Sequence, residues 1–202
     1  MSNPYQSPTA DPRSPVTVAD LSSLQPLRQQ IMVLRIIVIA LALGVVAFGV
    51  FTVMHNAGKP QTFAGKFEMP GILMLGFGLF VGLQGIVLPG ILFRFVKPNA
   101  AMTNQFAQHG PEVARVLTVQ SRIQVATIVG CALFEGGAFA NLVWYMNTAE
   151  LLHLAVAALL LLGILARFPL PGACERRIED ELRRQNQEAS LKPFAIDRPG
   201  RV

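Results

Sequence analysis

The sequence predicts an all-α fold, an integral membrane bundle of four transmembrane helices. Hydrophobic residues make up 52% of the 202 residues and charged residues only 14%, with a mean hydropathy of +0.46. This composition is too apolar for a soluble domain of this length. The apolar residues gather in four runs separated by polar segments. Because a bilayer core about 30 Å thick requires roughly 20 apolar residues in a helix, each run is a candidate membrane span.

The spans are predicted in order at about residues 31–54, 70–95, 121–146 and 150–168. The second run contains Gln84 and Pro89, and we expect the proline to interrupt its helix. The third run carries one charged residue, Glu135. The fourth run is the shortest and reaches a spanning length only if Arg167 extends its charge to the membrane interface. Residues 147–150, NTAE, are predicted to form the turn of a hairpin between the third and fourth spans.

Two tails are predicted to flank a transmembrane domain at residues 23–168. Residues 1–22 are rich in Pro, Ser and Asp, so we expect a disordered cytoplasmic tail. Within it, NPYQSP at residues 3–8 resembles the N-terminal opening of many planctomycete membrane proteins. Residues 169–202 form the C-terminal tail, in which a charged, solvated helix is predicted at about 173–187. Oppositely charged side chains four residues apart favour that helix.

The basic residues predict the orientation of the chain. Lys and Arg are concentrated before the first span, between the second and third, and after the fourth, whereas only Lys59 and Lys66 occupy the other side. Because positively charged loops are retained in the cytoplasm, both termini are predicted to be cytoplasmic in a bacterial cytoplasmic (inner) membrane. We therefore attribute the net charge of +5 to the orientation of the chain in the membrane. The sequence lacks the alternation of basic and aromatic residues that is typical of nucleic-acid binding, so no nucleic-acid partner is expected. The expected partners are membrane lipids and either a second copy of the chain or a larger membrane complex.

Glu135 is the candidate functional residue, because it lies at the centre of the third span. Inserting an ionised acidic side chain at that depth costs about 2.5 to 3.5 kcal/mol. Burial in a medium of low dielectric constant raises a carboxyl pKa, so we expect Glu135 to be largely protonated near neutral pH. Gln84 is its predicted hydrogen-bond partner, and Asn141 is a second candidate. Small residues are predicted to let the second and third helices approach closely, and these are Gly78, Gly82, Ala132, Gly136 and Ala140.

Residues 108–146, QHGPEVARVLTVQSRIQVATIVGCALFEGGAFANLVWYM, resemble the polar loop and second helix of the c subunits of rotary ATP synthases. In that family a polar loop precedes a helix of the pattern IGxALxEG. The resemblance implies that Gln108, Pro111 and Glu112 lie on a loop and that Glu135 is the ion-carrying carboxylate. Gly136 stands where sodium-carrying members have a hydroxyl residue, so the implied ion is a proton.

Two functional hypotheses follow from the sequence. The first is a non-enzymatic packing or complex component, in which Glu135 joins helices through hydrogen bonds. The second is a proton-carrying component of an ion-translocating assembly, a role that one carboxylate could serve only within an oligomer. No catalytic motif is present, so neither enzymatic activity nor a cofactor is expected. The spacing of His55, His109 and His153 predicts no metal site, and each is expected to be an ordinary interface residue.

Overall fold

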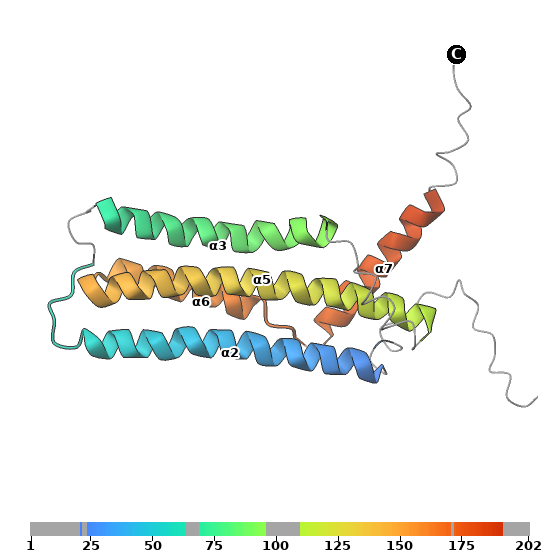
Figure 1. Ribbon diagram of the computed structural model, residues 1–202, viewed down its shortest axis with the longest axis horizontal. Coiled ribbons are helices and arrows are strands. Elements are labelled where there is room, and N and C mark those ends of the chain that lie inside the picture. The colour runs from blue at the N-terminus through green and yellow to red at the C-terminus, as the bar shows by residue number, and fades with distance from the viewer. Residues whose placement is uncertain (1–20, 22–23, 64–68, 96–109, 171, 192–202) are drawn as a thin grey trace, which may run out of the picture.

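The computed structural model describes residues 21, 24–63, 69–95, 110–170 and 172–191. Within these ranges the chain forms the helices α2 (Gln25–His55), α3 (Met69–Phe95), α5 (Pro111–Thr148), α6 (Leu151–Ala166) and α7 (Ala173–Leu191) (Figure 1). The only β pairing among these residues is an isolated bridge between Thr62 and Glu150. The predicted all-α class is therefore confirmed for the described part of the chain.

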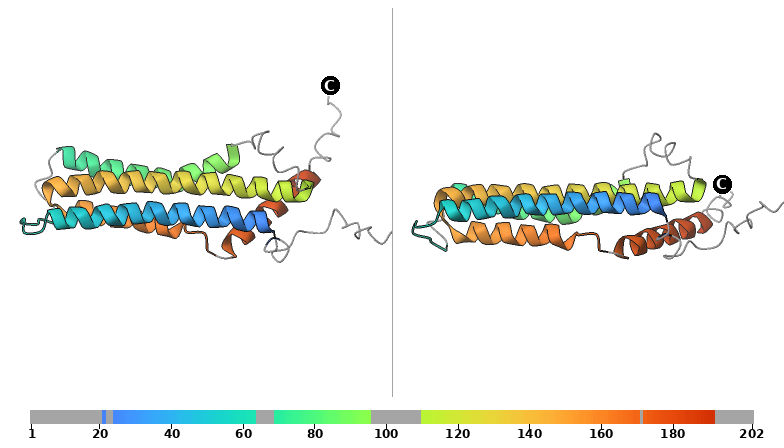
Figure 2. Two further views of the ribbon diagram at one scale, coloured as in Figure 1. Left: turned by 60° about the horizontal axis from the view of Figure 1, so that its bottom comes forward. Right: turned by 90° about the horizontal axis from the view of Figure 1, so that it is seen from below.

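Three of the described helices, α2, α3 and α5, are long and apolar enough to cross a membrane. Their lengths indicate association with a membrane. The fourth apolar helix, α6, has 16 residues and is shorter than a typical span. The four helices lie side by side in one bundle, and α7 continues from one end of it (Figures 1 and 2). We call this the α7 end, and the opposite end, where α5 turns into α6, the hairpin end.

The central helix of the bundle is α5, which packs against α3, α6 and α2. One apolar cluster joins α2, α5 and α6 along the middle of the bundle, and its largest buried members include Leu34, Phe134, Leu142 and Ile164. A second cluster lies at the α7 end, where Ile178 and Leu182 of α7 pack with apolar residues at the start of α2 and α5. Hence α7 is not the wholly solvated helix that its charges predict, because one of its faces is buried.

The helix α5 begins at Pro111, not near residue 121 as predicted, and it is unbroken to Thr148. Pro111 and Glu112, which the family resemblance implies to lie on a loop, occupy the first helical turn; Gln108 lies outside the described residues. Proline is favoured in a first turn, and an acidic side chain there interacts favourably with the helix dipole. Val116 and Leu117 are buried in the second cluster, which gives this extension an apolar contact outside the predicted span.

The helix α3 also differs from expectation, because Pro89 lies inside it without ending it. Proline lacks a backbone N–H, so the carbonyl of Gly85, four residues earlier, loses its helical donor. In the structure the guanidinium group of Arg167 donates a hydrogen bond to that carbonyl. The helix thus continues through the proline with an external donor in place of the internal one.

The hairpin end is closed by a turn shorter than predicted, since only Ala149 and Glu150 separate α5 from α6. Ala149 adopts a left-handed conformation with φ of 58°, and its N–H donates to the Tyr145 carbonyl at 2.8 Å. The first N–H groups of α6 donate to the carbonyls of Thr62 and Phe63 at 2.9 and 3.1 Å. These bonds satisfy helix-terminal donors that would otherwise lack partners.

Candidate functional site

Glu135 lies on α5 about 20 Å from its Thr148 end, a distance shorter than the thickness of a bilayer core, about 30 Å. Its side chain is half-buried and turns towards α2, where a Cβ atom on Gly44 would lie 3.5 Å from Oε1. Phe139, one turn further along α5, packs edge-on against Phe48 of α2 at 5.4 Å between ring centroids. The carboxyl group therefore lies at the seam between α2 and α5.

The predicted hydrogen bond between Gln84 and Glu135 is not formed. Gln84 belongs to α3, which contacts α5 through the face that carries Gly130 and Gly137. Counting residues places Gln84 and Glu135 at similar depths, but depth does not determine which way a side chain points. Among the described residues, Glu135 makes neither a hydrogen bond nor an ion pair with any side chain.

Asn141, the second candidate partner, also faces away from Glu135. Its side chain is fully buried, and Nδ2 donates to the Gly137 carbonyl at 2.9 Å. Its Oδ1 atom lies 3.0 Å from Nδ1 of His153 on α6, and Nε2 of His153 lies 3.4 Å from a carboxylate oxygen of Glu150. This chain of polar groups holds α6 against α5 at the hairpin end.

The expectation that His153 is an ordinary interface residue does not account for its burial: the side chain is fully buried beside Trp144, with 5.9 Å between the ring centroids. The sequence carried a partial signal for this role, since Glu150 and His153 stand three residues apart and share one helix face. Nothing in the sequence indicated that Asn141 would be the other partner.

The small residues predicted to pack α3 against α5 divide into two groups. Gly78 and Gly82 of α3 lie at close contacts, where added Cβ atoms would stand 2.1 Å from Asn141 Nδ2 and 2.7 Å from Leu160 Cδ2. Ala132 and Gly136 of α5 instead lie on an exposed face, with no atom within 4 Å of a Cβ placed on Gly136; Ala140 is half-buried. This exposed α5 face borders Glu135 and is not covered by any described part of the chain.

A second polar site, which the sequence did not reveal, is centred on Arg167 at the end of α6. Its guanidinium group lies 5.5 Å from the Phe134 ring centroid and donates to Gly85, as described above. A Cβ atom on Gly130 would stand 2.7 Å from Nη1, so the glycine leaves room for the arginine. Arg167 therefore turns into the bundle, whereas the sequence predicted that it would extend to the interface.

The described residues contain no group of three or more His, Cys, Asp or Glu side chains that could hold a metal ion. Comparison of the chain with protein-family models, curated proteins and solved structures finds no match. The chemistry of this protein has to be argued from its own geometry. Its distinctive features, among the described residues, are a carboxyl group on α5 without a partner and an arginine held inside the bundle.

Proposed function

We propose that the protein is a non-enzymatic, four-span component of a bacterial cytoplasmic membrane, which associates with a second copy of itself through the α5 face beside Glu135. The fourth span is α6, which follows α5 after two residues and lies beside it. Arg167 supplies the polar end of this short span. Three apolar helices of spanning length support the membrane location.

The proposed orientation has both termini in the cytoplasm. The helices α2 and α5 begin at the α7 end of the bundle (Figure 1), so the arginines near their starts lie at the same end as those of α7. Among the described basic residues, Lys59 stands at the opposite end, just after α2. Retention of positive charge in the cytoplasm supports placing the α7 end there.

The observation that carries the proposed association is the environment of Glu135. An acidic side chain near mid-membrane is costly unless it is neutral, hydrogen-bonded or both. Glu135 has no partner among the described residues, yet it borders an α5 face where the small side chains of Ala132 and Gly136 are exposed. Small residues allow backbones of two helices to approach, and polar side chains at such contacts form hydrogen bonds across them. A protonated carboxyl group could then donate to a neighbouring copy.

The mass of the full chain in mild detergent, with and without Ala132→Leu, tests this proposal. Leucine at residue 132 would hold the second copy away, so the wild-type chain should be oligomeric and the variant should shift to a monomer. Ala155→Leu is the matched control, because Ala155 is exposed on α6, away from this face, and should remain oligomeric. A monomeric wild-type chain, or equal dissociation of both variants, would contradict the proposal.

A second candidate function is proton carriage, as the resemblance to ATP synthase c subunits implies. The half-exposed position of the Glu135 side chain favours it, because a carrier carboxyl must be reached from outside its own helix bundle. Carbodiimide should then label Glu135 selectively, with protection at high pH where the carboxyl is ionised. Glu135→Gln should fold and assemble normally while losing labelling and ion-linked activity. Absence of labelling in an oligomer that dissociates on this substitution would leave only the packing role.

A further inference from the structure

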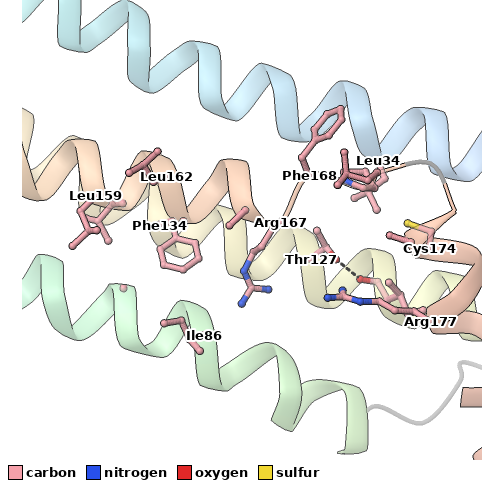
Figure 3. Close-up of a pocket in the computed structure, with 18 of the residues that line it drawn as sticks. Leu34, Ile86, Thr127, Phe134, Leu159, Leu162, Arg167, Phe168, Cys174 and Arg177 are labelled. Carbon is pink, nitrogen blue, oxygen red and sulfur yellow. Dashed lines mark hydrogen bonds between the residues drawn. The ribbon is translucent and has the colours of Figure 1, made fainter. Parts of the chain in front are cut away.

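A groove of about 880 Å³ runs along the side of the bundle between α3 and α6 and reaches the start of α7 (Figure 3). Most of its wall is aliphatic, and Leu79 and Leu83 of α3 face Leu159 and Leu162 of α6 with more than half of each side chain exposed. This volume lies within the range of sites that bind small organic molecules. In a membrane, such an open aliphatic groove faces lipid.

Two arginines stand together at the α7 end of this groove. Arg167 and Arg177 both line it, and in Figure 3 their guanidinium groups point into the same space beside α3. Two guanidinium groups without a negative charge between them repel each other, so the pair favours binding an anion.

Neither arginine has an acidic partner in the described part of the chain. Arg167 donates to the carbonyl of Gly85, and Arg177 makes no hydrogen bond or ion pair with a described residue. Glu175 and Glu179 each stand two residues from Arg177 in sequence, and neither pairs with Arg167 or Arg177; Glu179 is paired with Arg183 instead. A guanidinium group carries five N–H donors arranged to bind phosphate in a bidentate manner, and most of those donors remain available here.

The length of α6 places Arg167 inside the membrane boundary. Its 16 residues span about 24 Å, whereas a bilayer core is about 30 Å thick. The charge of Arg167 therefore lies several ångströms short of the headgroup region. An unpaired cation at that depth, inside the hydrocarbon core, is costly. A lipid phosphate drawn down to this depth would neutralise it, and the aliphatic groove would receive the attached acyl chains.

We propose that this groove binds one anionic phospholipid, with its phosphate between Arg167 and Arg177 and an acyl chain lying between α3 and α6. Basic pockets between transmembrane helices are suited to acidic headgroups, since both charge and apolar surface contribute. The assignment to the cytoplasmic leaflet rests on the proposed orientation. The lipid site itself depends only on the membrane location and not on the proposed self-association.

Native mass spectrometry of the full chain in non-ionic detergent tests the proposal with two lipids of identical acyl chains, phosphatidylglycerol and phosphatidylcholine. The wild-type chain should retain phosphatidylglycerol in preference to phosphatidylcholine. Arg177→Gln should weaken that binding about fivefold, the effect expected of one basic residue at a membrane surface. Arg176→Gln is the matched control: Arg176 is the adjacent arginine on α7, does not line the groove, and should not change binding. Arg177→Lys, which keeps the charge, should retain most of the preference.

Arg167→Gln should lower phosphatidylglycerol binding further, although it also removes the donor to Gly85 and could affect folding. The comparison of Arg177→Gln with Arg176→Gln is therefore decisive, because both positions are exposed. Equal binding of the two lipids, or equal loss in these two variants, would overturn the proposal. Displacement of the lipid by millimolar inorganic phosphate would also overturn it, because the groove would then select phosphate alone and not the whole lipid.

Discussion

Gly78→Ala should destabilise the bundle more than the addition of one methyl group suggests, because Gly78 lies against a buried polar group. A Cβ atom at residue 78 would stand 2.1 Å from Asn141 Nδ2, well inside van der Waals contact. The amide of Asn141 would have to move, and it holds two hydrogen bonds, to the Gly137 carbonyl at 2.9 Å and to His153 at 3.0 Å. The substitution therefore acts on the hairpin end as well as on the contact between α3 and α5.

The expected loss in free energy of unfolding of Gly78→Ala is the sum of three contributions. Loss of the two intramembrane hydrogen bonds costs about 1–3 kcal/mol together, and overpacking a close contact costs about 1–3 kcal/mol. The higher helix propensity of alanine offsets about 1 kcal/mol. The net loss in free energy of unfolding should be about 3 kcal/mol.

Thermal unfolding in detergent, followed by fluorescence, can measure this loss. Trp144 is the single tryptophan of the chain and lies beside His153, so its emission reports on the affected region. Gly76→Ala is the control, because the same substitution on the same helix meets no atom within 4 Å. In the double variant Gly78→Ala/Asn141→Ala the clash is absent, so its stability should exceed that of Asn141→Ala alone by about the 1 kcal/mol that the helix propensity of alanine contributes. Equal stability of the two single glycine variants would refute the reasoning.

Two further predictions concern the ends of the bundle. Asn56→Ala should lower the free energy of unfolding by about 1–3 kcal/mol, because its buried side chain donates to a main-chain carbonyl of α5 at 2.7 Å; Asn147→Ala, at an exposed position, should have no such effect in the same thermal assay. In a Cys131→Ser background, Cys174 should react slowly with maleimide at pH 7 and faster as the pH rises, because burial raises the pKa of its thiol and so lowers the fraction of reactive thiolate. Leu182→Asp should release the buried face of α7 and speed that reaction, and a rate unchanged by this substitution would show that α7 does not protect the thiol.

The positions of the apolar helices could be predicted from the sequence because apolar length alone determines whether a helix can span a bilayer. Counting residues also placed Glu135 near mid-depth. The direction in which Glu135 points could not be predicted, since a helix that is apolar on all sides has no period that identifies its contact face. That is why Gln84 was assigned as its partner and why the small residues of α5 were expected to face α3.

The remaining differences arise from contacts between distant segments. The sequence predicts that Pro89 interrupts α3, because proline lacks the N–H that the helix needs at this point. Arg167, which is distant in sequence, donates to the carbonyl of Gly85 in its place. His153 was assigned to the interface because a histidine near the end of an apolar run usually lies there. Its burial depends on Asn141, whose position on the facing helix no local pattern reveals.

The unbroken length of α5 has a mechanical consequence. Its 38 residues extend about 57 Å, nearly twice the thickness of a bilayer core, without a proline after the first turn or any other interruption. A helix of this kind behaves as a stiff rod, so a tilt or rotation imposed where α7 docks would be transmitted along its whole axis. A load applied at the α7 end would thus reorient Glu135 together with the hairpin at the opposite end.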